Sequence, residues 1–214
     1  LGGHGLLHAK PRPQYGVYAP ICSRNGVAFF GRDSDATLPV WSAKDGYPGD
    51  PAYREFHRDL GWDLPPERIA AHGLPGQRPL GLKLHRVSDQ SAPLDAKQPY
   101  QPEKAQARTR EHAQHFLQGR RDQLANLQAG MGTAPLLVAP FDAELFGHWW
   151  FEGPQFLAEL FRQGPEQRVR FSSLRAALGG TPNLQVCDPC PSSWGRGGFH
   201  DYWLNETNAW IVPE

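Results

Sequence analysis

The sequence is poor in cysteine and has no long apolar run. Three cysteines are too few to hold 214 residues together by disulfides. Cys187 and Cys190 form a single C-D-P-C pair with no second pair or nearby histidines, so all three read as ordinary thiols of a reducing compartment. No apolar run approaches the length of a membrane span, and the N-terminus lacks a signal-peptide pattern. We therefore expect a cytoplasmic protein with no membrane partner.

The sequence also lacks an excess of charge of either sign. Lys and Arg total 22, and Asp and Glu also total 22. This balance gives no indication of a nucleic-acid partner. His4 and His8 are spaced by one helical turn, but no third ligand accompanies them. We accordingly predict no metal and no cofactor.

Aromatic, proline and glycine residues are plentiful instead. The chain has 7 Trp, 21 Pro and 23 Gly, which indicates a loop-rich protein. Indole rings offer flat apolar faces with a polar edge, and this combination suits the faces of a sugar ring. The alternative for any single tryptophan is packing in the core.

One stretch of the chain combines a strand pattern with a group of polar and aromatic residues. Residues 136–139 form a short apolar run with a proline at each end, a pattern typical of a strand buried on both faces. Asp142 follows directly, where the carboxyl end of a parallel strand carries functional groups. The residues beyond it reinforce this interpretation: Glu144, His148, Trp149, Trp150 and Glu152. The alternative is that Asp142 only caps the next helix.

Periodicity along the rest of the chain predicts strands that alternate with helices. We expect strands over residues 26–30, 80–84, 136–139 and 168–171, and helices over residues 51–61, 102–128, 154–161 and 173–178. This alternation indicates βαβ units and a parallel sheet, which is an α/β fold.

Three long segments resemble glycoside hydrolase family 57, in particular its α-1,4-glucan branching enzymes. They are PFDAELFGHWWFEGP, the run from FGRD to VWSAKDGYPGDPAYREFHRDLGWD, and PSSWGRGGFHDYWLNETNAWIVPE. The resemblance implies the later part of a (β/α)7 TIM-like barrel with long helical and loop insertions. Residues 1–214 are then expected to be a single partial catalytic domain, without the first barrel strands and the C-terminal helical region.

The same resemblance assigns roles to individual residues. It implies that Asp142 is the general acid/base of a retaining mechanism, which pairs two carboxyl groups about 5 Å apart. Burial against Trp149 and Trp150 would raise the pKa of this acid. The family's nucleophilic glutamate has no counterpart here, and neither Glu144 nor Glu152 is assigned that role. We therefore expect the isolated chain to be inactive.

The expected substrate-binding residues are mostly aromatic, and they are Trp62, His148, Trp149, Trp194 and Trp203. For Trp62, packing under its loop is the alternative, and Trp210 is predicted to pack. Arg32, Asp33 and Trp41 are either site residues or a buried ion pair beside a packing ring. Arg196 departs from the family pattern, because an acidic residue is expected there.

The resemblance implies an α-1,4-glucan branching enzyme of glycogen biosynthesis, with amylose or glycogen as partner. Three alternatives stay open. The chain could belong to a 4-α-glucanotransferase or an α-amylase of the same family, it could be a non-catalytic glucan-binding module, or it could be a generic α/β domain whose tryptophans all lie in the core.

Overall fold

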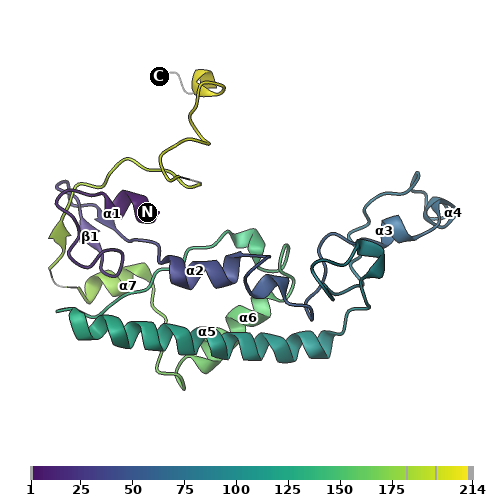
Figure 1. Ribbon diagram of the computed structural model, residues 1–214, viewed down its shortest axis with the longest axis horizontal. Helices are drawn as coiled ribbons and strands as arrows, with labels where there is room; N and C mark the ends of the chain where they lie inside the picture. The colour runs from purple at the N-terminus through teal and green to yellow at the C-terminus, as the bar shows by residue number, and fades with distance from the viewer. Residues whose placement is uncertain (1, 182, 196, 212–214) are drawn as a thin grey trace. The chain divides into compact units, whose positions relative to one another are not determined.

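The computed structural model describes residues 2–181, 183–195 and 197–211 (Figure 1). These residues form two compact units, each made of separate stretches of the chain. Unit 1 comprises Leu1–Thr37, Arg120–Pro140 and Arg170–Glu214, and unit 2 comprises Leu38–Gly119 and Phe141–Val169. Two helices, α2 (Ser34–Trp41) and α5 (Pro102–Gly130), pass from one unit into the other.

Unit 1 contains a small mixed sheet. Strand β1 (Ile21–Cys22) pairs antiparallel with β2 (Ala28–Phe29) and parallel with β3 (Gln185–Val186), so the strand order is β2-β1-β3. The other elements of the unit are the helices α1 (Gly3–Leu7) and α7 (Leu174–Gly179) and the 3-10 helix η4 (Ala209–Ile211). Leu6, Ala9, Ile21 and Cys187 form the buried core, against which Val17 and Phe29 pack.

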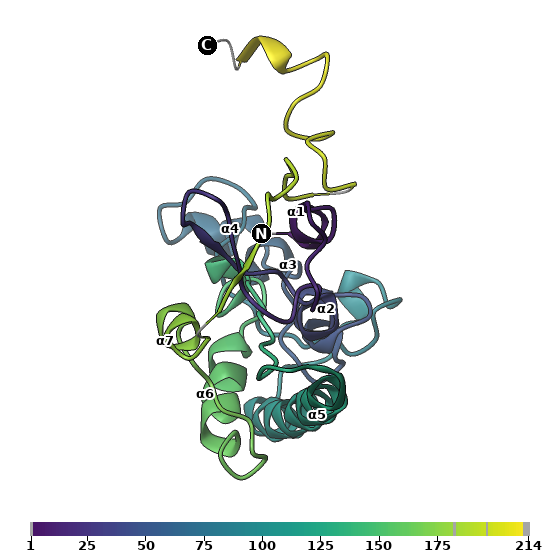
Figure 2. The same cartoon turned by 90° about the vertical axis from the view of Figure 1, so that its left-hand side faces the viewer.

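Unit 2 is built on aromatic side chains between helices. Helix α6 (Gly153–Gln163) lies beside α5 (Figures 1 and 2), and Phe116 of α5 meets Phe156 of α6 edge to face at 5.9 Å. Trp150 and Tyr53 complete this core. The ring centroid of Trp150 lies 5.0 Å from that of Phe156, and the ring centroid of Tyr53 lies 5.5 Å from that of Trp150. The shorter elements are η1 (Tyr47–Gly49), α3 (Leu60–Asp63), α4 (Pro66–Ala70), η2 (Leu94–Ala96) and η3 (Ala143–Leu145).

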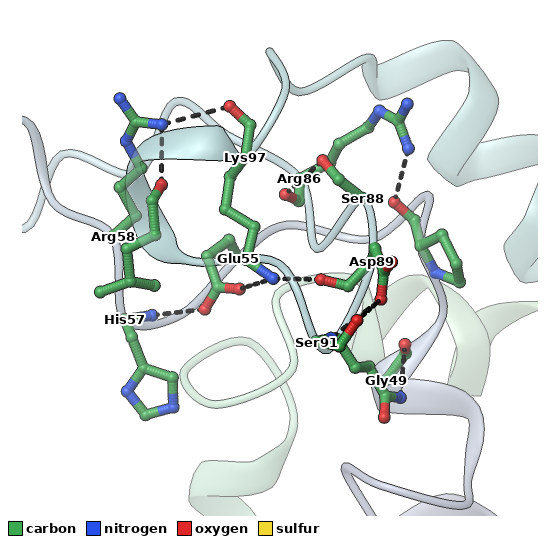
Figure 3. Close-up of polar contacts among 12 residues, drawn as sticks. Gly49, Glu55, His57, Arg58, Arg86, Ser88, Asp89, Ser91 and Lys97 are labelled. Atoms are coloured by element: carbon green, nitrogen blue, oxygen red, sulfur yellow. Dashed lines mark hydrogen bonds and ion pairs between the residues drawn. The ribbon is translucent and has the colours of Figure 1, made fainter.

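Much of unit 2 is irregular backbone that is held by side chains instead of a strand ladder. Three long side chains, those of Arg58, Arg86 and Gln90, donate hydrogen bonds to backbone carbonyls. Figure 3 shows Arg58 and Arg86. Their acceptors lie 2.8–3.2 Å away and include the carbonyls of Pro51, Gly49, Lys44, Leu94, Asp95 and Lys97. Carbonyls outside helices and strands lack a regular backbone partner, so these bonds stabilise loops that lack regular structure.

Three of the predicted helices are confirmed. Helix α5 covers the long pattern from Pro102, α6 begins at Gly153 with Pro154 in its first turn, and α7 begins after Ser173. The Ser173 hydroxyl accepts a hydrogen bond from the N–H of Ala176 at 3.2 Å and so caps α7. These helices were predictable because their signals are local.

The prediction of a helix over residues 51–61 is wrong. The backbone of this segment pairs instead with a distant one, since the N–H of Glu55 donates to the carbonyl of His85 at 2.9 Å and the N–H of Val87 donates to that of Tyr53 at 2.8 Å. A helix would use the same backbone groups internally. Helix α3 therefore begins only at Leu60.

The predicted strands are largely wrong. Only β2 falls within residues 26–30, and residues 80–84 contain no strand, with Leu82 and Leu84 exposed. Arg168 has a φ of 58° and turns the chain after α6, so residues 168–171 are not extended as expected. The apolar run 136–139 is half-buried, and backbone hydrogen bonds join Leu136 to Tyr18 at 2.9 Å and Asp33 to Val138 at 2.8 Å. Such isolated bonds do not make a ladder.

At the level of class, the fold is mixed α/β with a small sheet. Within the described residues, none of the helices combines the length and the apolar character that crossing a membrane requires.

Candidate active site

Asp142 directly precedes η3, but its side chain does not cap that helix. It makes no capping hydrogen bond and is exposed to solvent. Its Oδ2 atom instead accepts a long hydrogen bond, 3.5 Å, from the indole N–H of Trp41. The capping alternative is therefore wrong, and a carboxyl oxygen stays accessible to a ligand. The expected burial of Asp142 against Trp149 and Trp150 is also wrong, because Trp149 is half-exposed and Trp150 lies in the core.

The contact between Trp41 and Asp142 joins residues 101 positions apart in the chain. Trp41 is the last residue of α2 and nearly half-exposed. Its indole N–H can orient the carboxylate, while its ring remains open to solvent beside it. Of the two interpretations open for Trp41, a packing ring or a site residue, the geometry favours the second.

A tight loop presents His148 and Trp149 to solvent. Gly147 has a φ of 97°, and its N–H donates to the carbonyl of Trp150 at 2.9 Å, while the N–H of Trp150 donates to the carbonyl of Leu145 at 2.8 Å. Trp150 is buried by this turn, so the two preceding side chains face outward. His148 packs edge to face against Phe56 at 5.4 Å, and Trp149 is 49% exposed.

Glu152 anchors the other end of this loop in the core. It is fully buried, and its Oε1 atom accepts hydrogen bonds from the hydroxyl of Tyr100 at 2.6 Å and the N–H of Arg54 at 3.1 Å. Its Oε2 atom is buried and has no hydrogen-bond partner among the described residues. Burial raises the pKa of Glu152, against the opposing effect of these hydrogen bonds. Sequence patterns gave no signal for this network.

Because the pKa of Glu152 is raised in the folded state, the folded protein holds this proton more tightly than the unfolded chain does. The contribution of Glu152 to the free energy of unfolding should therefore be largest at acidic pH. It should fall as the pH rises from about 4.5, the ordinary value, through the raised folded pKa. Urea unfolding at several pH values checks this. The variant Glu152→Gln should lack this component of the pH slope, and an unchanged slope would contradict the expectation.

Trp62 is displayed on a short helix that is fixed by Asp59. Asp59 is buried, and its carboxylate accepts from the N–H groups of Gly61, Leu80 and Gly81 at 2.8–2.9 Å. Burial alone would raise the pKa of Asp59, but these bonds and Lys83 outweigh it and hold the pKa below its usual value. Trp62 is 53% exposed, so the alternative that it packs under its loop is wrong.

Unit 1 carries the two other predicted aromatic residues. Trp194 and Trp203 are both exposed, and the indole N–H of Trp203 donates to the carbonyl of Trp194. The guanidinium of Arg32 lies 4.3 Å from the ring centre of Trp194, and its Nε donates to Thr37 at 2.9 Å. Arg196, the departure from the family pattern, lies outside the described residues.

Two further expectations are corrected in unit 1. Asp33 is buried and caps α2, because its carboxylate accepts from the N–H of Ala36 at 3.2 Å and from the side chain of Gln123 at 3.1 Å. These bonds give the Asp33 carboxylate a structural role at the start of α2.

The prediction that Trp210 packs is wrong, since its side chain is 74% exposed. His4 and His8 contact Phe199 edge to face, and no cluster of three metal-ligating side chains occurs in the part of the chain that the structure describes.

No family model matches the sequence, but individual proteins do. A probable 1,4-alpha-glucan branching enzyme of Mycobacterium tuberculosis is 36% identical over 192 residues, 88% of this chain. The crystal structure of a GH57 branching enzyme from Thermococcus kodakaraensis, in complex with glucose and additives, has a TM-score of 0.76 at 32% identity over 91% of this chain. The crystal structure of the α-amylase AmyC from Thermotoga maritima has a TM-score of 0.86 at 38% identity over 99% of it.

The chain is a homologue of the GH57 enzymes. It spans about a third of the length of these relatives: 33% of the mycobacterial protein, 32% of the Thermococcus chain and 39% of the AmyC chain. The similarity to GH57 enzymes covers both units and so includes Asp142 and Trp41 in one and Trp194 and Trp203 in the other.

Proposed function

We propose that this GH57 homologue is the acid/base-bearing portion of an α-1,4-glucan branching enzyme. The observation that carries the proposal is the carboxylate of Asp142, which is solvent-accessible, free of any capping role and hydrogen-bonded to the indole of Trp41. A carboxyl group that is accessible to a bound ligand and not occupied as a helix cap can exchange a proton with that ligand. The homology to branching enzymes gives the reaction class.

In the proposed reaction, Asp142 protonates the glycosidic oxygen as the α-1,4 bond breaks. A nucleophilic carboxylate holds the sugar covalently, and Asp142 then takes the proton of the acceptor 6-hydroxyl as the α-1,6 bond forms. Glu152 is a poor candidate for the nucleophile, because it is fully buried and already bonded to Tyr100 and Arg54. We propose that residues 1–214 are one part of a single catalytic domain with a (β/α)7 TIM-like barrel, whose nucleophile lies in another part.

The proposed substrates are amylose and glycogen-like polymers, and the proposed setting is cytoplasmic glycogen biosynthesis. Three exposed tryptophans of unit 2 (Trp41, Trp62 and Trp149) and two of unit 1 (Trp194 and Trp203) support a polysaccharide ligand. An exposed indole offers an apolar face on which a sugar ring can stack, and burying that area is favourable. Their number also argues against the generic domain whose tryptophans are all in the core.

An α-amylase is the second candidate, and a specific observation favours it. The structure of the α-amylase AmyC superposes on 99% of this chain. Hydrolysis needs the same acid/base and differs only in the acceptor, which is water. A 4-α-glucanotransferase differs in the acceptor hydroxyl. The three activities share Asp142 and are separated by their products.

A chimeric enzyme tests the proposal. In it, these 214 residues replace the aligned segment of the Thermococcus branching enzyme. We expect the chimera to lower the iodine staining of amylose without a matching rise in reducing ends, and to form α-1,6 links. A rise in reducing ends would favour the amylase instead. A folded chimera that changes neither signal would contradict both catalytic proposals and leave a glucan-binding module.

A further inference from the structure

Unit 2 contains a pocket that Asp142 and Trp41 do not line. It has a volume of about 300 Å³ and lies between the segments 43–57 and 87–97 and the loop that carries Trp149. This volume is at the lower end of the range for small-molecule sites. The pocket therefore suits a single sugar ring or a short oligosaccharide end, not a large cofactor.

One wall of the pocket is polar and rigid. The Glu55 and Lys97 side chains are more than nine-tenths buried and form an ion pair at 3.6 Å (Figure 3). Glu55 also accepts from the N–H of His57 at 2.8 Å, and Lys97 donates to the carbonyl of Asp89. Within the described part of the chain, these contacts leave the ammonium group one further donor and the carboxylate further acceptor positions. A donor next to an acceptor matches a hydroxyl group, which is both.

The lining of the pocket also includes aromatic side chains. Trp149 is 49% exposed, and Phe56 is fixed between His57 and His148 at ring distances of 5.2 Å and 5.4 Å. These contacts hold the Phe56 ring in place without covering it fully. Flat rings and polar groups that line one pocket are the combination that binds a sugar, whose faces are apolar and whose edges carry hydroxyls.

The charges around the pocket argue against an anionic ligand. Lys97 is neutralised by Glu55, and the guanidinium of Arg54 lies over the ring of Phe151 at 3.5 Å. The other cations of the lining are Lys44, which is exposed, and Arg54, whose charge interacts with the buried carboxyl group of Glu152. A phosphate group would need several unpaired donors in one place.

We infer that this pocket is a glucan-binding subsite, in which one glucosyl residue of an α-glucan stacks on Trp149 and bonds the Glu55–Lys97 pair. The inference rests on the proposed function for the identity of the ligand. It goes further by assigning a binding role to Phe56, Glu55 and Lys97. The rigid loops around the pocket reduce the ordering cost of binding.

Calorimetric titration of the 214-residue chain with maltoheptaose tests the subsite. Trp149→Ala is expected to raise Kd about tenfold or more, the loss typical of removing an aromatic anchor. Trp149→Phe should recover part of this loss, and the double variant Glu55→Gln with Lys97→Met should raise Kd while keeping the fold. Trp210→Ala is the matched control, since Trp210 is exposed in unit 1, and its Kd should equal that of the parent chain.

The outcomes separate this inference from the proposed function. An unchanged Kd in Trp149→Ala and in the double variant would overturn the subsite, whether or not the chimera makes branches. Binding of inorganic phosphate in place of maltoheptaose would also overturn it. Maltoheptaose binding that depends on Trp149 in a chain whose chimera makes no branches would support the subsite and count against branching activity.

Discussion

Replacing Asp142 by asparagine is expected to lower the rate of branch formation by the chimeric enzyme about 10²–10⁴-fold, the usual contribution of a general acid/base. Asparagine has nearly the same shape and still offers an oxygen to the indole N–H of Trp41. It cannot give up or take the proton that the reaction transfers. The loss should therefore appear in the rate of the chemical step, measured by the formation of α-1,6 links, with the melting temperature unchanged.

Two neighbouring variants serve as controls for Asp142→Asn. Glu144 is exposed and lies two residues away, so Glu144→Gln should change the rate by much less. Trp41→Phe keeps an aromatic ring but removes the donor to Asp142, and a long hydrogen bond of 3.5 Å predicts a modest effect of several-fold. If Asp142→Asn keeps more than about a tenth of the activity, Asp142 is not the acid/base.

The helices of this protein were predictable where their signals are local, and the strands were not. Ser173 and Pro154 mark helix starts through contacts within one turn, so α6 and α7 follow from sequence alone. Residues 51–61 carry an equally good local signal, but the pairing of Glu55 with His85 decides their structure. Such pairing depends on contacts some 30 residues apart, which periodicity does not encode.

The residues of the candidate site were likewise predictable only in part. Family motifs pointed to His148, Trp149 and Trp62; all three are exposed, and their role in substrate binding stays a prediction. The contact between Trp41 and Asp142 and the polar wall formed by Glu55 and Lys97 could not be predicted. Each of these joins segments that are distant in the chain, and a lysine or glutamate in a polar loop normally indicates a solvated surface.

Replacing Lys97 is expected to destabilise unit 2 strongly, although lysine substitutions usually have little effect. Its side chain is 3% exposed and that of Glu55 is 9% exposed, so each ion has given up most of its hydration (Figure 3). Lys97→Met keeps the length of the side chain but leaves the carboxylate of Glu55 buried without its counter-ion. Removing one partner of a buried pair typically costs about 3–5 kcal/mol. Urea unfolding of the 214-residue chain should show a loss of this size.

The double variant Glu55→Gln with Lys97→Met decides whether the cost comes from the unpaired charge. The neutral amide that replaces the Glu55 carboxylate can still accept from the N–H of His57, and no unpaired charge is left buried. The double variant should therefore be only about 1–2 kcal/mol less stable than the parent chain. Lys104→Met on the exposed face of α5 is the matched control and should change the free energy of unfolding by less than about 0.5 kcal/mol. Equal losses in Lys97→Met and Lys104→Met would show that the pair is hydrated in solution. The polar wall of the pocket would then be too mobile to position a sugar hydroxyl.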